Sequence, residues 1–152
     1  MTEQDDEIAP DLIERLRARF SGHAALQRLA FELEDLSMDR CVMSLRFSAD
    51  IDSGAGNIHG GILASLADTA IACALSTSFD GKMGFATSNL NIHYLRRARS
   101  NVTASAVIIK KGSKVCVGQA DIRDVDQKLV ATVTADFVLT TSRLSPREAE
   151  QD

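Results

Sequence analysis

The fold of this chain is decided by residues 57–78, which read NIHGGILASLADTAIACALSTS. From Ile62 to Ser78, leucines and isoleucines alternate with alanines, so that apolar side chains surround the predicted helix almost completely. A helix of that kind is buried on most sides. At 1.5 Å per residue it is about 25 Å long, which is short for a membrane span and suits the centre of a core. We expect Asp80-Gly81 to end it.

Strands follow this helix in succession. Apolar and polar residues alternate, cleanly or nearly so, in four segments, which are residues 89–94, 101–109, 115–122 and 129–140. A further strand pair is predicted between Ala30 and Phe47, on either side of the polar stretch Ser37–Arg40. Long antiparallel strands around one buried helix predict an α+β fold in which the sheet wraps around the helix.

The chain as a whole has 152 residues, which suits one domain with a full core. We therefore expect a single domain over residues 1–152. Pro10 opens an amphipathic helix that is predicted at about residues 10–21, after a polar start over residues 1–9 that is expected to be frayed. A charged, solvated tail is expected at about residues 142–152.

Composition excludes several classes of function. A formal net charge of −4, without a basic helix face, argues against a nucleic-acid partner. The acidic, polar start and the lack of a long apolar run argue against a signal peptide and a membrane partner. Three widely spaced cysteines in apolar surroundings predict reduced thiols and a cytoplasmic location, and without ligand-like spacing they favour no metal site.

Asp68 is the one carboxylate in the apolar helix. Burying a carboxylate costs free energy unless it is paired, hydrogen-bonded, faces a cavity or has a raised pKa. The alternative is that Asp68 points to solvent or caps a neighbouring backbone turn. Its neighbours from Ala64 to Ala72 offer no obvious polar face, and the helix has no Lys or Arg. We therefore interpret Asp68 as a candidate nucleophile or general base for a bound ester.

His59-Gly60-Gly61 stands where the loop becomes the helix. The free N–H groups of a first helical turn can hold a developing oxyanion, and glycine lets a ligand approach the backbone closely. The alternative is an ordinary turn in which the glycines satisfy backbone geometry and His59 is a structural hydrogen-bonding residue. By itself the motif leaves both interpretations open.

The spacing of the two features has a consequence for assembly. Gly60 and Asp68 are eight residues apart, which on one helix separates them by about 12 Å. One carbonyl group cannot contact both. If they serve one reaction, the oxyanion donor of one subunit must meet the carboxylate of another, which predicts a dimer with two equivalent sites at its interface.

Three segments together carry a family resemblance: Asn57–Gly61, Leu66–Thr69 and the strand TSNLNIHYLR at residues 87–96. They resemble the hotdog-fold acyl-CoA thioesterases of the phenylacetic-acid-degradation (PaaI-like) type. The resemblance covers about residues 30–141. It implies a hotdog fold, an acyl-CoA substrate, no metal or redox cofactor, and dimers that join edge to edge and commonly pair into tetramers.

The same resemblance implies roles for individual residues. Asp68 would be the nucleophile or general base, the Gly60 N–H the oxyanion donor from the partner subunit, and His59 a nearby positioning residue. Thr87 stands where relatives often have a Ser or Thr that helps to hold the water or the carboxylate. Gly61 is expected beside the substrate.

The sequence departs from the family pattern at two places. Many relatives have an Asn six residues before the motif His; here that residue is Ser53, while Asn57 lies two before it, so both are candidates for contacting the thioester or water. Positive charge replaces the usual proline-containing turn after the last motif strand. The candidates for binding CoA phosphates, each of which could equally be an ordinary solvated charge, are Arg96, Arg97, Arg99, Lys110, Lys111 and Lys114.

The leading hypothesis is hydrolysis of an acyl-CoA thioester to the free acid and CoA. The alternative is a non-catalytic binder of acyl-CoA or another small ligand on the same scaffold, motivated by the missing Asn. A hydratase or dehydratase is a third hypothesis. It is disfavoured because such enzymes usually place an Asp and a His together, whereas here His59 lies about two and a half turns from Asp68.

Overall fold

The computed structural model describes residues 8–143 of the chain. In order along the chain, its elements are α1 (Pro10–Gly22), α2 (Ala24–Leu29), β1 (Phe31–Ser37), β2 (Arg40–Leu45), a 3₁₀ turn η1 (Ala49–Ile51), α3 (Gly60–Thr77), β3 (Met83–Tyr94), β4 (Val102–Lys111), β5 (Val115–Asp124) and β6 (Leu129–Arg143).

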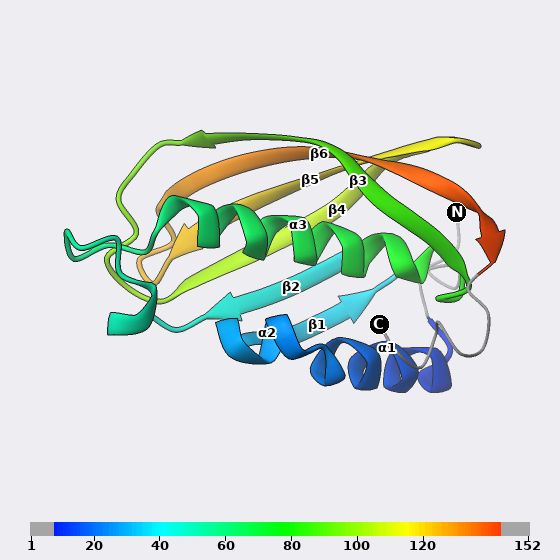
Figure 1. Ribbon diagram of the computed structural model, residues 1–152, viewed down its shortest axis with the longest axis horizontal. Coiled ribbons are helices and arrows are strands. Elements are labelled where there is room, and N and C mark those ends of the chain that lie inside the picture. Colours follow the sequence, from blue (N-terminus) through cyan, green and yellow to red (C-terminus); the bar gives the residue numbers. More distant parts are fainter. Residues whose placement is uncertain (1–7, 144–152) are drawn as a thin grey trace.

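The six strands form one antiparallel sheet in the order β1-β2-β4-β5-β6-β3. Helix α3 lies lengthwise across the concave face of this sheet, and α1 and α2 lie along its β1 side (Figure 1). Strands β1 and β3 are therefore the two edges. The predicted α+β fold, with an antiparallel sheet wrapped around one central helix, is confirmed.

Helix α3 is apolar because it forms the core. Leu66, Ala67, Ala70 and Ile71 have no exposed surface. Among the described helices this one alone is long and apolar enough to cross a membrane, but 56% of its residues are buried inside the protein. That burial identifies it as the core helix of the sheet.

Small residues on the inner face of the sheet let the helix approach closely. Ala104 on β4 and Ala120 on β5 are fully buried. At Gly118 on β5, a Cβ atom would lie 2.2 Å from Cγ2 of Ile71. No side chain fits there, so glycine at this position sets the spacing between α3 and β5.

The boundaries of α3 differ by one or two residues from the predicted 62–78. Glycines are poor helix formers, yet the helix begins at Gly60, because His59 is its N-cap and accepts a hydrogen bond from Gly61 N–H. At the other end, Asp80 and Gly81 have φ angles of 54° and 67°, and this left-handed turn leads the chain into β3.

The two ends of the chain also differ in part from expectation. Ile8 belongs to the start that was predicted to be frayed, but it is buried against the core. Strand β6 extends to Arg143, which is longer than the predicted strand and includes the first residues of the predicted tail. Residues 1–7 and the rest of that tail lie outside the described range.

Candidate active site

Asp68 lies near the middle of α3, where it is half-buried and faces β3. Oγ1 of Thr87 donates a hydrogen bond to Oδ1 of Asp68 across 2.9 Å. Burial raises the pKa of Asp68 above its ordinary value, and the hydrogen bond from Thr87 partly opposes that shift. Within residues 8–143, no Lys, Arg or His forms an ion pair with Asp68. The structure thus brings together Asp68 and Thr87, two of the residues that the sequence suggests for the site.

A carboxylate in this setting has the properties of a base or nucleophile. It is desolvated on the helix side, which makes its charged form more basic than that of a fully hydrated aspartate. Asp68 is only partly exposed, and its hydrogen bond goes to a side chain on β3 rather than to a backbone turn. Thr87 fixes one carboxylate oxygen and leaves the other without a hydrogen-bond partner among the described side chains.

The N-terminus of α3 presents one free backbone donor. Nδ1 of His59 accepts the Gly61 N–H across 3.0 Å, so that N–H is already occupied. The phenol of Tyr94 donates to the carbonyl of Gly60 across 2.7 Å. Gly60 N–H has no hydrogen-bond partner in the described part of the chain. Of the two glycines, Gly60 therefore offers a donor to a ligand and Gly61 does not.

A hollow of about 580 Å³ opens in front of this helix end. Its lining includes Asn57, His59 and Gly60 on one side and Tyr94, Arg96 and Arg97 on the other. Arg96 donates to the carbonyl of Leu129 across 3.0 Å. Arg97 makes no ion pair within residues 8–143, and its guanidinium remains available to an anion.

The six cations that sequence suggests for CoA phosphates do not form one patch. Arg96 and Arg97 lie at the N-terminal end of α3. Lys111 pairs with Asp39 across 2.6 Å, and the N–H of Asp39 in turn binds the hydroxyl of Thr77 at the last turn of α3. The two groups are thus separated by nearly the full length of that helix, about 25 Å.

The loop before α3 contains Ser53 and Asn57, the two candidates for the role of the missing Asn, and its conformation distinguishes between them. Oδ1 of Asp52 accepts the N–H groups of Gly54, Gly56 and Asn57 at 2.9–3.1 Å and thereby fixes the loop. Asn57 lines the hollow at the helix end, whereas Ser53 is exposed and does not. Asn57 is therefore the better placed of the two, although its Nδ2 already donates to the carbonyl of Ile58 across 3.3 Å.

The carboxylate and the free N–H do not meet within one chain. Gly60 is the first residue of α3 and Asp68 stands eight residues further along it, which corresponds to about 12 Å along the axis. Asp68 is absent from the lining of the hollow at the helix end. Within one chain, these two candidate groups are therefore too far apart to act on one carbonyl group.

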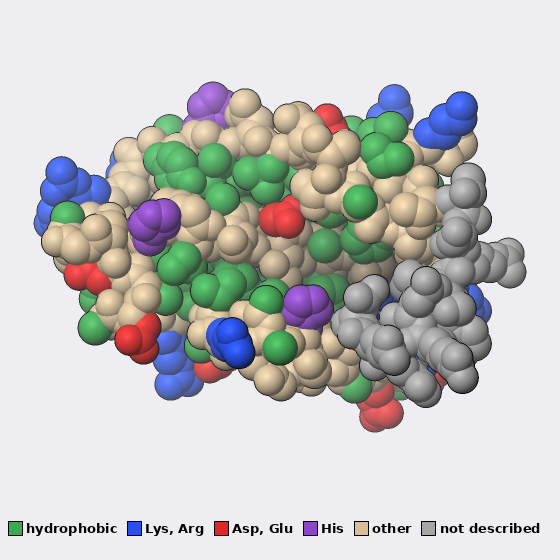
Figure 2. Space-filling view, in the orientation of Figure 1, with side chains coloured by type: hydrophobic (Ala, Val, Ile, Leu, Met, Phe, Trp, Pro, Cys, Tyr) green, Lys and Arg blue, Asp and Glu red, His purple; other side chains and the backbone are tan. Residues whose placement is uncertain are grey.

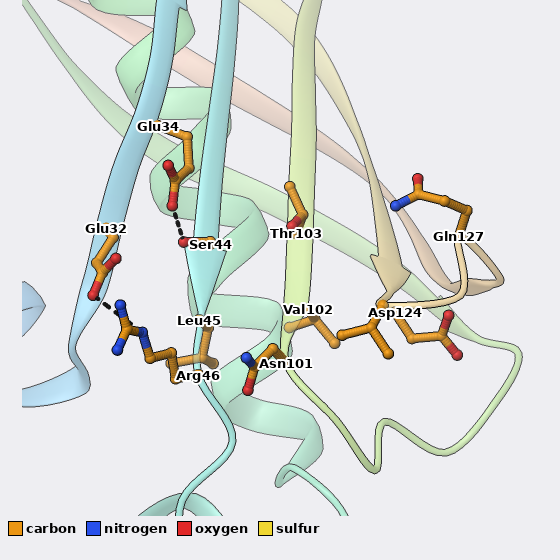
Figure 3. A pocket seen from close by; sticks show the side chains of 11 residues that line it. Glu32, Glu34, Ser44, Leu45, Arg46, Asn101, Val102, Thr103, Asp124 and Gln127 are labelled. Atoms are coloured by element: carbon orange, nitrogen blue, oxygen red, sulfur yellow. Dashed lines mark hydrogen bonds and ion pairs between the residues drawn. The ribbon is translucent and has the colours of Figure 1, made fainter.

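A further hollow, of about 260 Å³, lies on the face of the sheet away from α3 (Figure 3). Its carboxylates are engaged: Glu34 accepts a hydrogen bond from Ser44, and Glu32 lies 3.6 Å from the guanidinium of Arg46. Asp124 accepts two backbone N–H groups of its own turn. Since these groups satisfy one another, this hollow offers less to a reacting carbonyl than the surroundings of Asp68.

The cysteines and possible metal ligands add no chemistry to the site. A hydrogen bond with Cys41 and burial raise the pKa of the Cys73 thiol well above its ordinary value, so it stays protonated in the core. In the described range, no three His, Cys, Asp or Glu side chains lie close enough to hold a metal ion.

Two residues of the site were not assigned a role from sequence. Tyr94 belongs to the motif strand, but its contact with Gly60 joins residues 34 positions apart and depends on the fold. Asp52 could have been recognised, because an Asp that precedes Ser-Gly-Ala-Gly is a common organiser of turns.

Comparison with known proteins supports the assignment of the reaction class. Residues 55–131 match the family model described as "Thioesterase superfamily". A candidate esterase of Halobacterium salinarum is 29% identical over 140 residues, which cover 85% of this chain and 93% of that protein. The medium/long-chain acyl-CoA thioesterase YigI of Salmonella typhimurium is 33% identical over 98 residues, 54% of this chain and 62% of that protein.

Among solved structures, the E. coli PaaI protein from the phenylacetic acid degradation operon superposes with a TM-score of 0.82. The match covers 91% of this chain and all of that protein at 23% identity, and it supports the hotdog fold. The family match spans half of the chain and includes both Gly60 and Asp68. The chain therefore belongs to the thioesterase superfamily, whose reaction class is thioester hydrolysis.

Proposed function

We propose that the chain hydrolyses acyl-CoA thioesters in a site shared by two subunits. In this proposal Asp68 of one subunit is the general base or nucleophile, and Gly60 N–H of the other is the oxyanion donor. The observation that carries it is the pair of incomplete half-sites on α3: a desolvated carboxylate held by Thr87 and an unpartnered N–H about 12 Å away. His59 and Tyr94 hold the peptide that follows the donor.

The two edges of the sheet support a dimer that joins through β3. At the β1 edge, Arg17 of α1 donates to the carbonyl oxygens of Leu33 and Glu34 at 2.9 and 3.4 Å, which disfavours further strand pairing there. Strand β3 pairs with β6 on one side only. Pairing of two β3 strands would extend the sheet across both subunits and bring each α3 beside its partner's.

In the base-catalysed form of the reaction, Asp68 removes a proton from water as the water oxygen attacks the thioester carbonyl. The carbonyl oxygen becomes negative, and the partner's Gly60 N–H together with the helix dipole stabilises that charge. Collapse of the intermediate breaks the C–S bond, and the CoA thiolate leaves and takes up a proton. If Asp68 attacks directly, water hydrolyses the resulting anhydride in a second step.

The remaining expectations belong to the same proposal. Arg97, at the rim of the hollow beside Gly60, is placed to bind a CoA phosphate. No metal or redox cofactor has a part in the chemistry. We place the protein in the cytoplasm as one domain per chain, in dimers that pair into tetramers, without nucleic-acid or membrane partners.

Replacing Asp68 tests the carboxylate. In a thiol-release assay with a panel of acyl-CoA esters, Asp68→Asn should lower kcat about a thousandfold while the protein remains folded and assembled. Asp126→Asn, in an exposed turn, is the matched control and should keep full activity. Wild-type protein that binds acyl-CoA but releases no thiol from any ester would favour the non-catalytic binder.

Replacing Gly60 tests the oxyanion donor. Gly60→Pro removes the N–H at the first position of a helix, where proline is well accepted. The preceding His59 has φ −58° and ψ 132°, a conformation that tolerates a following proline. Gly60→Ala is the control, because it keeps the N–H but introduces the same Cβ, which would lie 3.2 Å from the Tyr94 ring. We expect kcat to fall about a hundredfold in the proline variant and much less in the alanine variant.

Mixing the two inactive variants tests whether the site is shared. In a dimer of one Asp68→Asn chain and one Gly60→Pro chain, one site carries both changes and the other carries neither. Random mixing should therefore restore about a quarter of the wild-type activity. If both groups act within one chain, the mixture stays as inactive as its components, and the composite site is wrong.

A further inference from the structure

A separate hollow of about 210 Å³ lies between α1, α3 and the start of β3. It is lined by Arg19 and Phe20 at the end of α1, His23 just after it, Ala72 and Ser76 of α3, and Phe85 of β3. No assignment above uses these residues. The position of the hollow relative to Asp68 suggests which part of a substrate the hollow could bind.

On α3, the hollow lies on the same face of the helix as the carboxylate. Asp68, Ala72 and Ser76 follow one another at intervals of four residues, so they share one face of the helix. Ala72 lies about 6 Å and Ser76 about 12 Å beyond Asp68 along the axis. A group bound at Asp68 can therefore extend along this face into the hollow.

Strand β3 also lines up Asp68 with the hollow, on the side of the hollow that faces α3. Thr87, which holds Asp68, is two residues from Phe85, so their side chains point to the same face of the strand. The Phe85 ring is fixed edge-on against Phe137, with ring centroids 5.5 Å apart. The hollow thus begins two residues along β3 from Thr87, about 7 Å away, and the fixed Phe85 ring forms one of its walls.

The chemistry of the lining is apolar inside and basic at the rim. Phe20, Phe85 and the methyl group of Ala72 provide apolar surface, and the hydroxyl of Ser76 donates to the carbonyl of Ala72 across 3.0 Å. Arg19 and His23 have no ion pair with the described residues, and no carboxylate lines the hollow. Figure 2 shows this face of the molecule, where hydrophobic side chains gather over α3 and β3 and charged ones are few.

We propose that this hollow binds the acyl group of the thioester, and that the preferred acyl group is apolar and no larger than a phenyl ring or a medium-length alkyl chain. The proposal rests on the proposed function, since it places the thioester carbonyl at Asp68. The size limit follows from the volume: an apolar cavity of about 150 Å³ accommodates benzene, and this hollow has about 210 Å³. Acyl groups that carry an amine are disfavoured by the cations at the rim.

Helix α1 is thereby a determinant of specificity as well as a cover for the β1 edge. Phe20 and Arg19 come from its last turn, and they approach α3 and β3 only because α1 packs beside α3. A change of length or angle of α1 would alter the far wall of the hollow without touching Asp68, Thr87 or Gly60.

The test compares kcat/KM across acetyl-, hexanoyl-, octanoyl-, palmitoyl-, benzoyl- and phenylacetyl-CoA for the full chain. Ala72→Leu fills the hollow, and we expect it to lower the ratio of hexanoyl- or phenylacetyl-CoA to acetyl-CoA by about tenfold or more. Ala18→Leu adds the same side chain to the exposed side of α1 and should leave the ratio unchanged. The aryl and alkyl esters show which apolar shape is preferred.

A second variant enlarges the hollow by shortening the side chain of Phe20. Phe20→Leu should improve octanoyl- relative to hexanoyl-CoA, and it retains an apolar side chain if Phe20→Ala does not fold. If Ala72→Leu and Phe20→Leu lower all esters equally, or change none, the acyl group binds elsewhere, while thioester hydrolysis through Asp68 still stands. If the wild-type protein hydrolyses no ester in the panel, both proposals are overturned.

Discussion

The phenol of Tyr94 and the carbonyl oxygen of Gly60 are 2.7 Å apart and share a hydrogen bond. The same peptide unit donates its N–H, that of Gly61, to Nδ1 of His59. Both polar ends of the peptide that follows the proposed oxyanion donor are thus held. The preceding peptide, which carries Gly60 N–H, is held as well, because its His59 carbonyl accepts the N–H groups of Ile62 and Leu63. The direction of Gly60 N–H is thus supported from both sides, which is the form of preorganisation that lowers a barrier.

Removal of the Tyr94 hydroxyl is the first prediction. Tyr94→Phe keeps the ring that packs on Gly60 and loses only the hydrogen bond, so we expect kcat to fall by about tenfold and KM to change little. Steady-state kinetics measure the two parameters separately. A raised KM at unchanged kcat would instead indicate that Tyr94 contacts the substrate.

The second prediction concerns pH. The proposed mechanism uses the carboxylate form of Asp68. Because burial raises the pKa of Asp68, kcat/KM should rise with pH through a value above that of an ordinary aspartate. The Thr87 hydrogen bond lowers this pKa, and Thr87→Val should move the acid limb to higher pH. Thr69→Val, whose hydroxyl bonds the Ser65 carbonyl instead, should leave the limb in place.

The third prediction links the same shift to stability. Because the pKa of Asp68 is raised in the folded state, the folded state binds this proton more tightly than the unfolded state does. Its stabilising contribution is complete below the ordinary aspartate pKa and is lost as pH rises through the raised value. At pH 7, therefore, Asp68→Asn should increase the thermal midpoint, and the increase should disappear in acid. Calorimetry of the wild-type protein and the variant, at pH 7 and in acid, measures both midpoints. A variant less stable than the wild type at pH 7 would falsify the prediction.

The contact between helix and sheet gives the fourth prediction. A Cβ on residue 118 would lie 2.2 Å from Ile71 Cγ2, so Gly118→Ala must push α3 away from β5. We expect a loss of about 1–3 kcal/mol in the free energy of unfolding. Gly22→Ala serves as the control, since nothing lies within 4 Å of its added Cβ. Urea denaturation measures both variants, and equal stability of the two would show that α3 adjusts without cost.

The elements that sequence predicts best are those with a strong period. Apolar residues at nearly every position identify α3, which is buried on most sides. Alternation of apolar and polar residues identifies β4 and β6, because one face of each strand is buried. Helix α2 was missed, since its six residues are too few to display a period. The start of α3 at Gly60 depends on the side chain of His59 as N-cap, which overrides the low helix propensity of glycine.

Some features of the candidate site can likewise be read from the sequence, whereas others depend on the fold. Asp68 is visible in sequence as a charge in an apolar helix, and the axial distance to Gly60 needs only helix geometry. The contacts of Tyr94 with Gly60 and of Phe20 with the hollow beside Ala72 join distant parts of the chain, and no local pattern encodes them. Among the six cations proposed for CoA, sequence could not separate those at one end of α3 from those at the other.

The two edges of the sheet also limit how the protein can aggregate. A β-sheet with two open edges can add strands from other chains indefinitely, which is the route to fibrils. Here Arg17 occupies two carbonyl oxygens of the β1 edge, which disfavours strand addition there and leaves β3 as the more open edge of the described sheet. When the β3 strands of two chains pair with each other, both of these edges become covered. The pairing proposed to complete the active site would therefore also limit further growth, because it covers the more open edge of each chain's described sheet.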